Sequence, residues 1–161
     1  TDIRRAQKEP IEVYFAKSPQ SVDDYYALHV ETYTRTGVKP HPREYFDAIY
    51  RHFVTTDRAF WIMARDGRDV LGCVNLATFG DASLYWTGAY TAAGLKRGVS
   101  KLLQWEAIRF AKAKGLRFHE TGEVFPEARG SGTKEAGLTD YKMHFGGIIV
   151  PFRKGVYTGA P

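Results

Sequence analysis

The chain has 161 residues, of which 43% are hydrophobic and 25% are charged. This length fits one domain that buries roughly two-thirds of the surface exposed by its unfolded form, so no disulfide or metal is needed for folding. The formal charge of +5 favours anionic partners such as phosphates and nucleotides. The sequence contains no run of about 18 apolar residues, so it predicts no membrane span. The single cysteine, Cys73, lies in an apolar run, so we expect it in the core of a cytoplasmic protein.

The first part of the chain predicts one strand and two helices. Residues 11–16 alternate enough to read as a strand, which ends before a Ser-Pro pair. From there to Gly37, apolar and aromatic side chains recur at the spacing of one helical face. His29 lies on that face, so we expect it in the core. Residues 42–53 predict a second helix with a proline in its first turn.

The rest of the chain predicts a sheet crossed by one long helix. The expected elements, in order, are strands at 59–65, 70–79 and 83–89, a helix at 99–114, a strand at 116–120, a glycine-rich loop at 126–137, a helix at 138–145 and a last strand at 146–153. The full order β-α-α-β-β-β-α-β-α-β predicts an α/β protein with a mixed sheet flanked by helices. We expect a single domain over residues 1–161.

The strand–helix–strand unit over residues 83–121 predicts the position of a ligand cleft. In open sheets of this kind, clefts lie beyond the carboxyl ends of the strands, where neighbouring strands part. We therefore expect the strands before and after helix 99–114 to separate near Ala89 and Glu120. Residues 89–99 would then line the cleft.

Several short motifs resemble one protein family along nearly the whole chain. They are the opening TDIRRAQKEPIEV, ETYTRTG at 31–37, YWTGA at 85–89, LLQWEAIRFAKAKGLRF at 102–118 and LTDYKMHFGG at 138–147. In this order they resemble the FemAB/FemX branch of the GNAT acyltransferase superfamily. The resemblance implies a GNAT-like fold. The opening segment resembles the one that leads into the second of the two GNAT-like halves in that branch.

The resemblance implies acyl transfer to an amine, without a metal and without a tightly bound cofactor. In the Fem branch the donor is an aminoacyl-tRNA and the acceptor is a peptidoglycan precursor. In the wider superfamily the donor is acetyl-CoA. The implied substrate is anionic or nucleotide-linked. The implied acceptor is an amine of a cell-envelope or polysaccharide precursor, and in the CoA-dependent alternative it is a small amine.

The chain resembles one half of a tandem protein, although the cleft of the family is shared between halves. A missing N-terminal half or a homodimer would complete such a cleft. A third interpretation is a GNAT-like half-domain that binds a glycan or a partner and performs no chemistry.

A basic segment before the third helix is the candidate site for substrate or cofactor phosphates. CoA-dependent relatives carry a glycine-containing phosphate loop at this position, and here the segment contains Gly94, Lys96, Arg97 and Gly98 at a different spacing. It predicts either an anion site or a simple helix start. Arg35, at the end of the first helix, compensates the helix dipole or binds substrate phosphate.

Lys142 is the candidate catalytic residue. In the family that the chain resembles, a lysine followed by Phe-Gly-Gly supplies a cationic group at the reacting centre. Lys142, followed by Phe145 and two glycines, matches this lysine, so the resemblance implies the same role for it. A fixed ammonium aimed at the oxygen that gains charge could contribute about 3 kcal/mol. The alternative is a partly exposed helix lysine beside inward-packed Tyr141 and Phe145. Phe145 is expected to contact the substrate or cofactor.

Two further positions carry titratable groups. Glu106 lies on the apolar stripe of the third helix, where it predicts a structural pair with an arginine or the backbone rather than a catalytic base. His119, beside Glu120 and Glu123, could act as a general base. The family has an aspartate and a glycine at this position. No second His or Cys lies at a ligand spacing, so we expect no metal.

Overall fold

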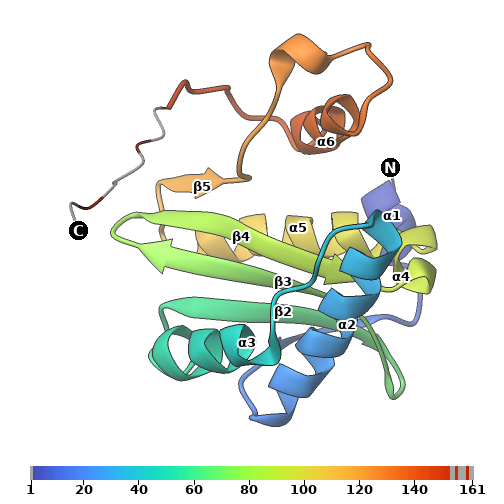
Figure 1. Ribbon diagram of the computed structural model, residues 1–161, viewed down its shortest axis with the longest axis vertical. Coiled ribbons are helices and arrows are strands. Elements are labelled where there is room, and N and C mark those ends of the chain that lie inside the picture. The colour runs from blue at the N-terminus through green and yellow to red at the C-terminus, as the bar shows by residue number, and fades with distance from the viewer. Residues whose placement is uncertain (1, 153–154, 156–158, 160–161) are drawn as a thin grey trace. The chain divides into compact units, whose positions relative to one another are not determined.

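The structure, a computed structural model, describes residues 2–152, 155 and 159 (Figure 1). The chain forms two compact units, residues 1–122 and residues 123–161. The first unit contains a five-stranded sheet in the order β1-β2-β3-β4-β5. Its strands are β1 (Glu12–Ala16), β2 (Ala59–Asp66), β3 (Asp69–Phe79), β4 (Ala82–Tyr90) and β5 (Phe118–Glu120).

The sheet is mixed, as the sequence predicts. Strands β1 to β4 pair with one another in antiparallel fashion, and the expected turn joins β2 to β3 through Gly67 at φ 57°. Strand β5 returns parallel to β4 after the long helix, as a strand–helix–strand unit requires. The register between β3 and β4 shifts between Asn75 and Leu76, which places a bulge at Trp86.

Helices cover both faces of the sheet (Figure 1). The first unit contains α1 (Asp2–Ala6), α2 (Gln20–Thr36), α3 (Arg43–Ile49), the π-helix η1 (Tyr50–Val54), α4 (Ala92–Lys96) and α5 (Val99–Ala113). Helices α2 and α3 pack on one face and α5 on the other, so two apolar clusters form. Cys73 and His29 are buried in the structure, which confirms both expectations.

The cluster beneath α2 is built around aromatic rings. Tyr25 of α2 and Trp61 of β2 are both fully buried, and their rings meet edge to face at 5.1 Å. Trp61 lies directly opposite Asn75 on β3, and Asn75 lies opposite Thr87 on β4. The hydroxyl of Tyr25 is hydrogen-bonded to that of Thr87. This row ties α2 to the middle of the sheet.

Helix α5 buries the apolar stripe that the sequence predicts. Its buried residues include Val99, Leu102, Leu103, Ala107 and Ala111. Glu106 is 22% exposed rather than fully buried, and Arg109 Nη1 lies 3.0 Å from both of its carboxylate oxygens. The predicted structural pair with an arginine is therefore confirmed.

The structure differs from the sequence prediction at four elements. Helices α1 and α4 are additional, and in the second unit α6 (Lys134–Met143) begins four residues before the predicted helix, after a 3-10 turn η2 (Pro126–Ala128). The last strand is wrong over residues 146–152, which form no strand, and Arg153 lies outside the described residues. Residues of high strand propensity need a neighbouring strand to pair with, and propensity alone does not supply one.

Candidate active site

Strands β4 and β5 part after a short stretch of pairing. Residues Ala82–Leu84 pair with Phe118–Glu120, whereas β4 continues to Tyr90. Within the described part of the chain, no strand therefore pairs with residues 85–90 on the β5 side of the sheet. The expected separation of these two strands is confirmed. We call this open part of β4, residues 85–90, the β4 edge.

The β4 edge presents the peptide groups of Gly88. Thr91 N–H donates to Leu71 O of the neighbouring β3 side at 3.0 Å, whereas Tyr90 N–H donates to Thr32 Oγ1 at 2.9 Å. Because alternate residues of a strand direct N–H and C=O to opposite sides, Gly88 faces the same side as Tyr90, away from β3. An exposed N–H and C=O on a sheet edge can pair with an extended ligand.

The end of α2 closes the β4 edge at Tyr90. Thr32 Oγ1 accepts from Tyr90 N–H and also donates to Tyr90 O at 3.0 Å. Glu31 Oε1 accepts from Ala92 N–H at 2.8 Å. Our reading of the sequence missed both residues, although they lie in the motif ETYTRTG. Nothing in the local sequence around a threonine and a glutamate in the last turns of a helix indicates that they will contact a distant strand.

Arg35 lies at the same end of the β4 edge. Its Nη2 donates to Tyr90 O at 3.0 Å, and its Nη1 lies 3.4 Å from Glu31 Oε1. These contacts hold the guanidinium against the strand and leave other N–H donors on it. Binding of substrate phosphate by Arg35 stays a prediction.

Two tyrosine hydroxyls lie directly beneath Gly88. Tyr85 Oη and Tyr90 Oη are hydrogen-bonded at 3.0 Å. A Cβ atom on Gly88 would lie 1.9 Å from Tyr85 Oη and 2.8 Å from Tyr90 Oη, so only glycine fits. Burial raises the pKa of Tyr85 to about 12, and the hydrogen bond from Tyr90 opposes the shift only in part. The Tyr85 hydroxyl is therefore neutral at physiological pH. A lone glycine in a strand of aromatic residues was a signal for close packing.

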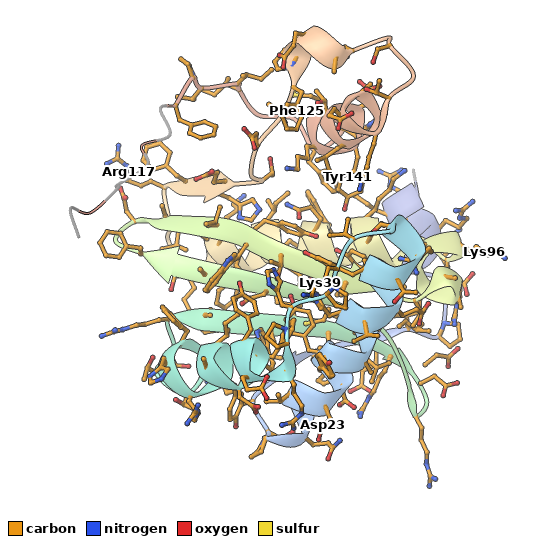
Figure 2. All side chains as sticks on the ribbon, viewed as in Figure 1. Asp23, Lys39, Lys96, Arg117, Phe125 and Tyr141 are labelled. Atoms are coloured by element: carbon orange, nitrogen blue, oxygen red, sulfur yellow. The ribbon has the colours of Figure 1, made fainter. Side chains whose placement is uncertain are left out.

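The basic segment forms a short helix rather than an open phosphate-binding loop. Thr91 caps α4 by accepting from Gly94 N–H at 2.9 Å, and a Cβ on Gly94 would lie 2.4 Å from Leu71 O. Gly98 adopts φ 76° at the start of α5, a conformation that favours glycine. Lys96 is exposed and extends outward from α4 (Figure 2). The segment therefore has features of the simple helix start.

Arg97 is held between two carboxylates. Its Nε lies 3.0 Å from Glu9 Oε2 and its Nη1 lies 2.9 Å from Asp66 Oδ2, with only a quarter of its side chain (25%) exposed. These pairs join the segment before β1, the β2–β3 turn and the α4–α5 junction, and they neutralise the guanidinium. Anion binding by Lys96, Arg97 and Gly98 stays a prediction, with Lys96 as its most accessible cation.

His119 is integrated into the fold by both ring nitrogens. Its Nδ1 lies 2.9 Å from Ser83 Oγ on β4, and its Nε2 lies 3.0 Å from Gln104 Nε2 on α5. Because an amide nitrogen is a donor, Nε2 accepts and Nδ1 donates to the serine. Burial lowers the pKa of His119, which keeps the ring neutral. These contacts favour a structural role over the general base.

An aromatic surface flanks the β4 bulge on the side of α2 and α3. The aromatic wall comprises Tyr33, His41, Tyr45, Phe53 and Trp86. The ring of His41 stacks on that of Tyr45 with centroids 4.5 Å apart, and Phe53 meets Trp86 edge to face at 5.6 Å. His41 is exposed and Phe53 is 38% exposed, so the wall is accessible to a ligand.

Behind this wall, His29 is buried and predicts a pH dependence of stability. Its Nε2 accepts from His41 N–H at 2.9 Å, and desolvation lowers its pKa from 6.5 to about 4, with a smaller contribution from His41. The unfolded chain then binds more protons between these two pH values, so stability is lost as the pH falls from about 6.5 to 4. We expect a loss on the order of 3 kcal/mol in the free energy of unfolding from this group.

Urea unfolding at pH 7.5 and pH 4.5 tests this prediction. His29→Gln keeps a hydrogen-bond acceptor without a titrating ring, so its stability should fall less between the two pH values. His144→Gln, at an exposed position, is the matched control and should behave as the unmodified protein does. An equal loss of stability in the His29 variant and the control would contradict the assignment.

The second unit holds Lys142 on α6. Lys142 Nζ donates to Glu123 O at 2.7 Å, and its side chain is half-buried. The rings of Tyr141 and Phe145 pack edge to face with their centroids 5.5 Å apart. Figure 2 labels Tyr141 on α6 and Phe125 just before η2. Thr139, fully buried, accepts from Phe125 N–H at 2.9 Å and so ties α6 to the chain before η2. The ammonium group of Lys142 is thus held in place, and its catalytic role stays a prediction.

Among the described residues, His, Cys, Asp and Glu side chains form no group of three that could hold a metal ion. Among the same residues, no helix combines the length and apolar character needed to cross a bilayer.

Comparison with known proteins assigns the chain to a family. Residues 1–143 match the family model described as an acetyltransferase (GNAT) domain. The chain belongs to the GNAT acetyltransferase family, and its mixed sheet flanked by helices is consistent with that fold. No curated protein matches the chain in sequence.

Solved structures show the same fold at low sequence identity. FemX superposes with a TM-score of 0.77 at 13% identity over 88% of this chain, which spans only about half (51%) of FemX. The aminoglycoside acetyltransferase AAC(6')-Iy, bound to a CoA-containing bisubstrate analogue, has a TM-score of 0.68 at 12% identity, with 95% of this chain and 100% of that chain covered. The ribosomal-protein-S18-alanine N-acetyltransferase of Escherichia coli has a TM-score of 0.64 at 11% identity, covering 84% and 76% of the two chains.

Proposed function

We propose that this domain transfers an acyl group from the thioester of acetyl-CoA to an amine along the β4 edge. The observation that carries the proposal is the outward-facing peptide group of Gly88 where β4 and β5 part. The pantetheine arm of CoA is extended and contains amide groups, so it can pair with such an edge as an added strand does. The CoA-containing ligand of AAC(6')-Iy, a protein of the same fold, supports this donor.

The chemistry needs a donor for the oxygen that gains charge. The amine nitrogen attacks the thioester carbon, a C–N bond forms, the C–S bond breaks, the amine loses a proton and the CoA thiolate gains one. Gly88 N–H is a candidate hydrogen-bond donor to the thioester oxygen, and one such donor contributes about 3 kcal/mol. The hydrogen-bonded Tyr85 and Tyr90 hydroxyls hold the strand conformation beneath this peptide.

Lys142 is the proposed catalytic cation of the second unit. Its ammonium group is directed by Glu123 O, which orders a side chain that would otherwise move freely. Arg35, Lys96 and Gly98 are proposed to bind the anionic part of the donor, and Phe145 to pack against substrate. Arg97 is proposed to bind this anionic part only if the ligand displaces one of its two carboxylate partners.

The proposed acceptor is an amine carried by a cell-envelope or polysaccharide precursor. The aromatic wall offers several ring faces beside the β4 edge, and ring faces attract ammonium groups. The resemblance of the sequence motifs to the FemAB/FemX branch supports an acceptor of this class. The likeness in fold to the aminoglycoside acetyltransferase AAC(6')-Iy supports a small amine as the alternative. An aminoacyl-tRNA donor is the corresponding alternative on the donor side.

A stability measurement with donor candidates tests the proposal. Acetyl-CoA at about 100 times its dissociation constant should add roughly 2.7 kcal/mol to the free energy of unfolding. Release of free CoA thiol in the presence of amino sugars or small amines then identifies the acceptor class. Stabilisation only by aminoacyl-tRNA would replace acetyl-CoA as the donor. No stabilisation and no thiol release would favour the GNAT-like half-domain that binds without chemistry.

A further inference from the structure

The outer side of α5 carries a groove that lies outside the proposed active site. Its volume is about 630 Å³, and it is lined by Gln7, Trp105, Ile108, Arg109, Lys112 and Ala113. Gln7 follows α1 directly and the other residues belong to α5 or its end, so the groove lies within the first unit. Binding sites for small ligands have volumes of about 300–1,000 Å³.

An indole ring forms part of the groove. Trp105 is 37% exposed, whereas Trp61 of the core is fully buried. Ile108 follows three residues later on the same helix, so its side chain neighbours the indole and extends the apolar surface. A large aromatic side chain that remains accessible in a concave site offers a flat face on which another ring can stack.

Two cations border this ring. Lys112 has no ion pair with any residue that the structure describes, and Arg109 is 60% exposed. Glu106 accepts from a single Arg109 nitrogen, Nη1, so the other guanidinium donors remain for a ligand. A carboxylate or phosphate group is therefore attracted to the groove.

We propose that this groove binds a nucleotide through its base and its phosphate. The base stacks on Trp105, and the phosphate is bound by Lys112 and Arg109, which combines a ring face with charge-assisted hydrogen bonds. Gln7 supplies an amide for the edge of the base. The site does not depend on the proposed acyl transfer, because it shares no residue with the β4 edge or with Lys142.

Calorimetric titration of the intact protein with three probes tests both parts of the proposal. AMP carries ring and phosphate, adenosine carries only the ring, and ribose 5-phosphate carries only the phosphate. We expect AMP to bind at least about tenfold more tightly than either of the others. Equal binding of adenosine would overturn the phosphate contact, and equal binding of ribose 5-phosphate would overturn the stacking. No saturable binding of AMP would overturn the whole proposal.

Substitutions locate the binding in the groove. Trp105→Ala should weaken AMP binding at least about tenfold, Trp105→Phe should keep it within about threefold, and Lys112→Gln should weaken it and reduce its salt dependence. Phe79→Ala and Arg68→Gln are matched controls, an exposed aromatic residue and an exposed cation at the turns of the sheet, and should bind as the unmodified protein does. Equal losses in the controls would contradict the assignment.

Two further titrations distinguish a free nucleotide from an RNA strand and test whether the groove is separate from the acyl-donor site. Tetra-adenylate that binds at least about tenfold more tightly than AMP identifies an RNA strand, and equal affinity identifies a free nucleotide. The titration with AMP is repeated with saturating acetyl-CoA. Unchanged AMP affinity supports a separate groove, whereas displacement of AMP would place it at the acyl-donor site and overturn the inference.

Discussion

Lys142→Ala should lower turnover about 100-fold or more and leave substrate affinity nearly unchanged. The expected result follows from the proposed role, because a cation that acts on a developing negative charge contributes in the transition state and little in the ground state. Lys142→Arg should restore little of the activity, since a planar guanidinium does not replace a compact ammonium at a tight oxygen site. Steady-state kinetics with the acceptor found above provide kcat and KM separately.

The structure also supplies the competing explanation for Lys142 and a way to exclude it. The hydrogen bond from Lys142 Nζ to Glu123 O could serve only the stability of the second unit. In that case the alanine variant should lose about 1–3 kcal/mol of stability with kcat unchanged. Lys134→Ala, at the exposed start of the same helix, is the matched control and should alter neither quantity. A stability loss without a loss of turnover would make Lys142 structural.

Gly88→Ala should have the second large effect, and Tyr85→Phe should partly reverse it. The added Cβ would lie 1.9 Å from Tyr85 Oη, so either the tyrosine or the strand must move. Overpacking of this kind costs about 1–3 kcal/mol. Displacement of the Gly88 peptide from the β4 edge should also lower kcat/KM about 100-fold, the loss typical of one misplaced oxyanion donor.

A double-mutant cycle separates the clash from other effects of the two changes. Tyr85→Phe removes the hydroxyl that the new Cβ would meet, so the double variant should recover about 1–2 kcal/mol relative to the sum of the single variants. Gly137→Ala, where a Cβ has nothing within 4 Å, is the control and should be neutral or slightly stabilising. Additive effects of Gly88→Ala and Tyr85→Phe would mean that the hydroxyl does not limit the space at Gly88.

The sequence predicted the candidate site better as a region than as a set of contacts. The parting of β4 and β5 was expected from the order of elements, and the structure confirms it. The contacts of Thr32 with Tyr90 join residues 58 positions apart, and no local pattern indicates which strand a helix end will meet. Gly88 lay within a quoted motif, but only its distances to Tyr85 and Tyr90 explain why it must be glycine.

Arg97 illustrates why single charged residues are harder to assign than elements. A basic residue before a helix predicted either an anion site or a simple helix start, whereas in the structure Arg97 pairs with Glu9 and Asp66, which lie 88 and 31 positions away. A long cationic side chain takes whichever carboxylate the folded chain brings within reach, and local spacing carries no information about that choice.

The sequence by itself determined the positions of most helices and strands, the mixed sheet, the burial of Cys73 and His29, and membership of an acyltransferase superfamily. These properties follow from hydrophobic periodicity and short motifs, which involve residues that are close together in the sequence. Only the tertiary structure decided the pairing of Arg97, the closure of the β4 edge by α2 and the absence of a strand over residues 146–152. Each of these depends on which distant surfaces meet, because hydrogen bonds, ion pairs and strand pairing require a partner that the local sequence does not contain.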